Sequence, residues 1–162
     1  MLFLLLVMVG GLAAQKNQSP QWKEYTYQED GFAISAPAPP AIAPDPQAAD
    51  VQIYRWELAP NVLFTIHSGA RPNCPNVLAS LKNSLLKNQY GEYVPGSRKD
   101  ISLSGNAGFE YEMALKTGRK TFERLYCTKG KSFSLTVAYP GNQTRSATAD
   151  KMFSSFRLLS SH

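Results

Sequence analysis

Histidines, cysteines and long hydrophobic runs are all scarce in this 162-residue sequence. Two separated cysteines, one histidine within the chain and one at its last position match no metal-ligand spacing. No C-x-x-C motif is present, so a thioredoxin-type redox site is not supported. The longest apolar run lies at the N-terminus and is shorter than the roughly 20 residues that a membrane-spanning helix needs. We therefore expect no cofactor, no metal and no transmembrane span after that segment is removed.

The overall composition is that of an ordinary globular domain. Hydrophobic residues make up 43% of the chain and charged residues 18%, with 11 glycines and 11 prolines. These values exclude a disordered, collagen-like or coiled-coil protein. A chain of this size buries roughly two thirds of the surface that its unfolded form exposes, so its core needs neither a metal nor a dense set of disulfides.

The N-terminus has the pattern of an export signal. Residues 1–9 are all apolar, and Gly10, Gly11 and the small residues Ala13 and Ala14 follow. We predict a signal peptide over residues 1–14, a single mature domain over residues 15–162, and a periplasmic or secreted location. No Lys or Arg precedes Lys16, so the usual positive segment is missing or the true start lies upstream. The alternative is a buried N-terminal strand, but the apolar run is unbroken rather than alternating.

Export bears on the two cysteines, Cys74 and Cys127. In an oxidising compartment, an even pair in a small domain is a candidate disulfide. A bridge that closes a loop of this length would stabilise the fold by about 2–4 kcal/mol. Two unrelated buried thiols remain the alternative, because the sequence gives no distance between the two alpha carbons.

The first half of the chain predicts strands. Period-two alternation and β-forming residues indicate strands over residues 22–27, 32–36, 51–58 and 62–68. The last two are separated by a short turn and predict a hairpin. The segment over residues 36–49 is rich in Pro and Ala and poor in large side chains, so we interpret it as a surface loop.

The second half predicts two helices around a set of strands. The first helix is expected over residues 75–90, since Pro75 suits its first position and Leu78, Leu81 and Leu85 fall on one stripe. Four further strands are expected over residues 98–103, 108–115, 121–128 and 131–139. A closing helix is expected over residues 146–156. This order predicts an α+β fold in which helices pack on an antiparallel sheet.

Several short motifs, taken in this order, resemble those of the PsbP/DcrB-like family of small exported bacterial proteins. They are Gly31-Phe32-Ala33-Ile34 with a proline stop, Gly108-Phe109-Glu110-Tyr111, Arg124-Leu125-Tyr126 and Phe153-Ser154-Ser155-Phe156. The resemblance covers residues 22–158. It implies an α-β-α sandwich with a central, mainly antiparallel sheet and two main helices. It also implies a scaffold for binding and assembly, without a common catalytic set.

Catalytic residues are few. No G-x-S-x-G motif occurs, and His67 is the histidine that could serve as a general base, since His162 ends the sequence. Its neighbour Ser68 points to the opposite face of a strand, which argues against a Ser-His pair on that segment. A hydrolase-type enzyme is the alternative function. It would be favoured by a cleft that gathers His67 with a carboxylate from elsewhere in the sheet, for which the candidates are Glu110, Glu112 and Glu123.

Positive charge is concentrated in the second half of the chain. Lys and Arg give residues 82–162 a net charge of +7, whereas residues 1–81 have a net charge of −2. Seven of these cations fall at expected strand ends or turns: Arg98, Lys99, Lys116, Arg119, Lys120, Lys129 and Lys131. We interpret them as a basic rim along one edge of the sheet that faces an anionic partner. The alternative is that they serve solubility alone.

These observations together predict an exported, non-catalytic binding or assembly module of the cell envelope. The expected partner is an envelope protein, an anionic lipid or a polysaccharide. Nucleic acid is not expected, because export removes the protein from chromosomes and no helix-turn-helix or aromatic stacking motif accompanies the lysines.

Overall fold

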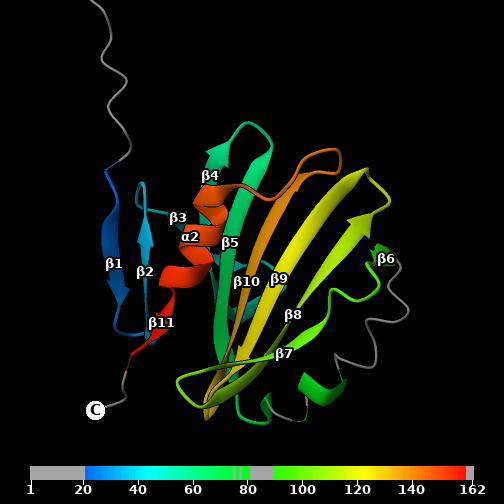
Figure 1. Cartoon of the computed structure of the whole chain (residues 1–162). Helices are drawn as coiled ribbons and strands as arrows, with labels where there is room; N and C mark the ends of the chain where they lie inside the picture. Colours follow the sequence, from blue (N-terminus) through cyan, green and yellow to red (C-terminus); the bar gives the residue numbers. More distant parts are fainter. Residues whose placement is uncertain (1–20, 75, 77, 81–89, 160–162) are drawn as a thin grey trace, which may run out of the picture.

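Two antiparallel sheets and the helix α2 organise the computed structural model of this chain, which describes residues 21–74, 76, 78–80 and 90–159 (Figure 1). The predicted signal peptide over residues 1–14 lies outside these residues. No helix within the described ranges is long and apolar enough to cross a membrane.

Among the described residues, the larger sheet has eight strands, and every pairing in it is antiparallel. In spatial order these are β3 (Ala41–Asp45), β4 (Ala48–Ala59), β5 (Val62–Arg71), β10 (Gly130–Pro140), β9 (Arg119–Cys127), β8 (Asn106–Leu115) and β6 (Gly91–Tyr93). The strand β7 (Lys99–Leu103) also pairs with β8.

The sequence of β10 shows why the two faces of this sheet differ. Phe133, Leu135 and Val137 are buried on one face. Ser134 and Thr136 alternate with them and therefore point to the other face. The apolar face is covered, and the face with the hydroxyl groups contributes to the site described below.

A second layer covers the apolar face (Figure 1). It consists of a three-stranded sheet and one helix: β1 (Lys23–Tyr27), β2 (Phe32–Ala36), β11 (Arg157–Leu158) and α2 (Ala147–Ser155). The helix begins after Ser146, whose hydroxyl accepts a hydrogen bond from the backbone N–H of Ala149 at 3.2 Å. Met152, Phe153 and the following Phe156 pack into the core between the layers.

A smaller apolar cluster lies on the opposite face, over β8 and β9. Its buried members are Cys74, Leu78, Phe109, Tyr111, Met113 and Cys127. The β8 residues of this cluster alternate with Glu110 and Glu112, which places the two sets on opposite faces of the sheet.

All predicted strands fall on observed ones, but the predicted loop over residues 36–49 is wrong in part, because β3 and the start of β4 lie within it. Strand β3 is an edge strand in which Asp45 is the only residue that is not exposed, so no apolar alternation marks it. It also contains Pro44, which is tolerated at a sheet edge because one side of that strand needs no N–H donor.

The predicted closing helix over residues 146–156 is confirmed as α2. Of the helix predicted over residues 75–90, Asn76 and residues 78–80 are helical, and residues 75, 77 and 81–89 lie outside the described residues. The structure thus shows a mainly antiparallel β protein with short helical segments in its described part.

Candidate functional site

A cavity of about 370 Å³ opens on the face of the larger sheet that is turned away from α2. Its floor comes from the central strands β5, β10 and β9, whose side chains on this face include His67, Ser134 and Glu123. Asp45 of β3 lies at one side, and the segment around Cys74 lies at the other. Residues that are distant in sequence meet here because β10 pairs with both β5 and β9.

Glu123 is a partly buried carboxylate on the cavity floor. Its Oε1 atom accepts a hydrogen bond from the Thr136 hydroxyl at 2.9 Å, across the β9–β10 pairing. Burial raises the pKa of this carboxyl above its usual value, and the bond from Thr136 acts in the opposite direction. Burial thus disfavours the ionised form of this acid, whereas a nearby cation or a further hydrogen-bond donor would favour it.

His67 lies between an acid and a hydroxyl group. Its Nδ1 atom is 3.6 Å from Asp45 Oδ2. Strand β4 lies between β3 and β5, so the two side chains meet over β4. On the other side, Ser134 of β10 is the direct cross-strand neighbour of His67. Cross-strand neighbours place their Cβ atoms about 4.5–5.5 Å apart, so the two side chains share one part of the cavity.

A disulfide forms part of the cavity wall. Cys74 and Cys127 are bonded, with alpha carbons 5.4 Å apart, and this confirms the predicted pair. Both residues are buried. Leu78, Leu125 and Val51 add apolar surface to the cavity lining, so it has an apolar part as well as the polar floor.

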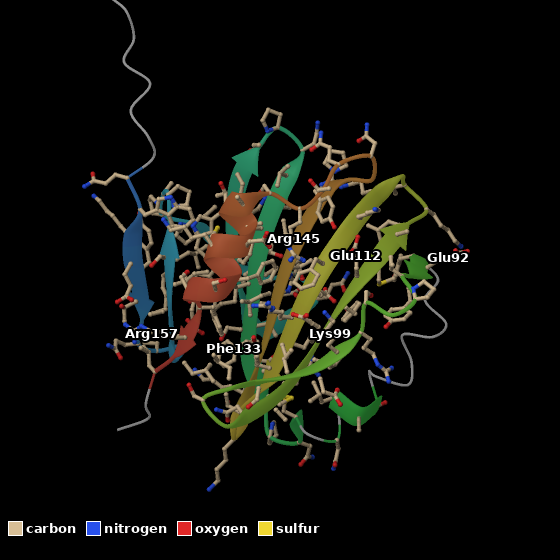
Figure 2. The ribbon with its side chains drawn as sticks, viewed as in Figure 1. Glu92, Lys99, Glu112, Phe133, Arg145 and Arg157 are labelled. Atoms are coloured by element: carbon tan, nitrogen blue, oxygen red, sulfur yellow. A yellow bond between two sulfur atoms is a disulfide. The ribbon has the colours of Figure 1, made fainter. Side chains whose placement is uncertain are left out.

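Only one of the three carboxylates considered as partners for His67 lies in this cavity, and it is Glu123. Glu110 and Glu112 lie on the opposite face (Figure 2 labels Glu112 there, on the same side as Arg145). Glu110 Oε2 accepts from Arg124 Nε at 2.9 Å. Glu112 Oε1 accepts from the Tyr139 hydroxyl at 3.1 Å.

The seven basic residues do not form one continuous rim. Lys116, Arg119 and Lys120 lie at the β8–β9 turn, whereas Lys129 and Lys131 lie at the β9–β10 turn, at the opposite end of the sheet (Figure 1). Consecutive antiparallel hairpins alternate between the two ends of a sheet, so these turns could not share an edge. The other two cations, Arg98 and Lys99, lie at the start of β7.

Several of these cations have partners within the protein. Arg119 donates from Nη2 to the backbone oxygen of Asn61 at 2.9 Å, and Lys120 Nζ lies 3.8 Å from Glu112 Oε1. Lys131 donates from Nζ to the backbone oxygen of Glu29 at 2.6 Å. Lys99, Lys116 and Lys129 are exposed. The basic residues therefore form one small group at each end of the sheet and a third pair at the start of β7. Some of them interact with other groups of the protein rather than with solvent alone.

Sequence reasoning identified His67 and Glu123 as candidates but missed Asp45, Ser134 and Thr136. Asp45 was assigned to a loop, and the hydroxyl residues have no motif that marks them. In the part of the chain that the structure describes, no group of three or more His, Cys, Asp or Glu residues is placed to hold a metal ion.

No family model and no curated protein matches the sequence. The structure is similar to that of cyanobacterial PsbP (CyanoP) from Synechocystis sp. PCC 6803, with a TM-score of 0.61 and 12% identity over 93% of this chain and 98% of that one. It is also similar to a crystal structure from Bacteroides thetaiotaomicron VPI-5482, with a TM-score of 0.55 and 8% identity over 85% of this chain and 48% of that one. The chain therefore has a PsbP-like fold, as its sequence motifs predict.

Proposed function

We propose that this protein is a non-catalytic ligand-binding module that works in the cell envelope or outside the cell, with its ligand site in the cavity around His67 and Glu123. The disulfide supports an oxidising compartment, and hence a periplasmic or secreted location. The finer α-β-α arrangement with two main helices also stays a proposal, because most of the segment 75–90 lies outside the described residues.

The observation that carries the proposal is the combination of polar floor and apolar wall in one concave site. Its volume of about 370 Å³ lies in the range of small-molecule sites, which are roughly 300–1,000 Å³. Glu123 faces it with a desolvated carboxyl that has no counter-ion among the described residues. Burying an acid in this way reduces stability, so a role in binding is a reason to retain it.

A fragment screen by protein NMR tests this proposal. The wild-type protein should bind polar fragments that shift the amide signals of His67, Glu123 and Ser134. The variant Ser134→Phe should lose that binding, because the ring fills the cavity. Ser102→Phe, at an exposed site on β7, is the matched control and should bind as the wild type does. Fragments that shift only residues outside the cavity would contradict the proposal.

A hydrolase remains the second candidate, because His67 lies between Asp45 and Ser134 in the order of an acid, a base and a nucleophile. One observation argues against a hydrolase. Ser134 lies in β10, which pairs with β5 on one side and β9 on the other, so the backbone N–H groups around Ser134 donate hydrogen bonds within the sheet. Acyl transfer needs two free donors for the oxyanion. A fluorophosphonate probe decides between the two: labelling that disappears in Ser134→Ala would favour the enzyme, and no labelling is expected for a binding module.

The predicted contact with an anionic envelope lipid or polysaccharide also stays a proposal, and the fold divides it into separate tests. Neutralising Lys116, Arg119 and Lys120 changes one end of the sheet, and neutralising Lys129 and Lys131 changes the other. The fraction of protein that sediments with vesicles containing phosphatidylglycerol should then fall for only one of the two variants. If both variants sediment with the vesicles as the wild type does, the cations serve solubility alone.

A further inference from the structure

The cavity is acidic in a protein that is basic as a whole. The chain has a net charge of +5, yet the carboxylates of both Asp45 and Glu123 line the cavity. The cation among its described lining residues is Arg71, which is exposed at the end of β5. A ligand that enters the cavity therefore meets an acidic side chain at the floor and another at one side.

The carboxyl group of Glu123 has unused capacity to accept hydrogen bonds. Thr136 bonds to Oε1, and Oε2 has no hydrogen-bond partner in the described part of the chain. Each carboxylate oxygen has two lone pairs, so both oxygens of Glu123 can accept further hydrogen bonds. Because Glu123 lines the cavity, a ligand bound there is the natural donor.

Hydroxyl groups continue the polar floor beside this carboxyl group. Ser132, Ser134 and Thr136 alternate along β10 and all line the cavity, at intervals of about 6.6–6.8 Å. Thr136 donates its proton to Glu123, so its oxygen lone pairs remain available as acceptors. An ammonium group has three N–H donors and no acceptor, and it would find three acceptors in Glu123, Ser134 and Thr136.

We propose that the ligand of this cavity is a small organic amine, whose ammonium group pairs with Glu123 and whose hydrocarbon part packs against Leu78, Leu125 and the Cys74–Cys127 disulfide. This inference rests on the proposed function of the cavity as a ligand site. It selects a cationic and partly apolar molecule over a carboxylate, a phosphate or a neutral sugar.

The electrostatics of the floor are consistent with this ligand class. Burial raises the pKa of the Glu123 carboxyl, and an adjacent ammonium group is the kind of neighbour that favours the ionised form. An amine that binds as its cation would pair with the ionised carboxyl of Glu123 and would thereby offset part of the effect of burial.

Three probes of similar shape and different charge test the proposal: 2-phenylethylamine, 2-phenylethanol and 3-phenylpropionate. NMR titration of the folded protein at neutral pH gives the affinity of each and the residues that it shifts. The amine should bind in the cavity at least about tenfold more tightly than the alcohol, the ratio expected for one charge-assisted pair. The carboxylate should bind more weakly than both.

Substitution of the carboxyl group provides the second test. Glu123→Gln keeps the shape of the side chain and should reduce the preference for the amine to within about twofold, while binding of the alcohol is retained. Glu110→Gln, on the opposite face, is the matched control and should keep the preference. If Glu123→Gln does not fold, the ranking of the three probes on the wild-type protein still decides.

The outcomes separate this inference from the function on which it rests. If the alcohol or the carboxylate binds in the cavity as tightly as the amine, the amine assignment is wrong and the ligand site stands. If the preference for the amine survives in Glu123→Gln, the assignment of Glu123 is wrong. If no probe shifts any cavity residue, the amine proposal fails, and the fragment screen then decides on the cavity itself.

Discussion

The Cys74–Cys127 disulfide should contribute a large part of the stability of this domain. The bridge joins residues that are 53 positions apart, and it therefore restricts a long loop in the unfolded chain. The loop-entropy relation gives about 4 kcal/mol for a loop of this length. A domain of this kind has a total unfolding free energy of about 5–15 kcal/mol, so loss of the bridge is a substantial fraction of it.

Urea unfolding of the mature protein, with and without a phosphine reductant, measures this contribution. The reduced wild type keeps both sulfur atoms in place, so its difference from the oxidised protein reports on the covalent link. We expect a loss of about 4 kcal/mol and a larger dependence on urea, because the unlinked unfolded chain is less compact.

The double variant Cys74→Ala/Cys127→Ala is the control for the reductant. It should be no more stable than the reduced wild type, because it also loses two buried sulfur atoms, and the reductant should not change it. A loss of less than about 1 kcal/mol on reduction of the wild type would refute the loop-entropy reasoning for this protein.

Three further predictions concern the floor, the core and the sheet. The pKa of Glu123 in the folded protein lies above its usual value of 4.5, so the contribution of this residue to stability should be complete below pH 4.5 and should be lost as the pH rises through the raised pKa. In thermal melts at a series of pH values from acid to neutral, Glu123→Gln should show a smaller fall in melting temperature than the wild type. Phe153→Ala removes a ring that packs at 4.8 Å from Phe64, measured between centroids, and should cost about 3–5 kcal/mol in urea unfolding, with the exposed Ser154→Ala as the control that changes little. Gly108→Ala should destabilise the β8–β9 pairing in hydrogen exchange, because an added Cβ would lie within 2.2 Å of the Leu125 backbone oxygen, while Ala107→Ser at the exposed neighbouring position should not.

The sequence predicts strands well where one face is buried. The alternation of the buried Val62, Phe64 and Ile66 with half-buried residues marks β5, and similar patterns mark β8, β9 and β10. It fails at β3, where nearly every residue is exposed and the strand is held by backbone pairing to β4. That error also removes Asp45 from any sequence-based description of the site.

The site itself could be predicted only in part, because it depends on strand order and register. His67 stands out as the histidine within the domain, but its neighbour Ser134 becomes a neighbour only through the β5–β10 pairing. The sequence alone gives no reason to prefer Glu123 over Glu110 or Glu112 as the partner of His67. The alternation along β8 and β9 in the folded sheet places Glu123 on the face of the cavity and the other two on the opposite face. The basic rim was wrong as a single surface because consecutive turns lie at opposite ends of a sheet.

The small sheet joins the two ends of the described chain. Strand β2 pairs with β1 on one side and with β11 on the other, and Arg157 Nη2 reaches Glu24 Oε1 at 2.7 Å. Both ends of the described chain thus lie in the layer that covers the apolar face of the large sheet, whereas the cavity lies on the other face. Figure 1 shows the small sheet next to α2. A fluorophore, an affinity handle or a sensor surface coupled to either end would leave the mouth of the cavity unobstructed, which makes this domain suitable for binding measurements on a support.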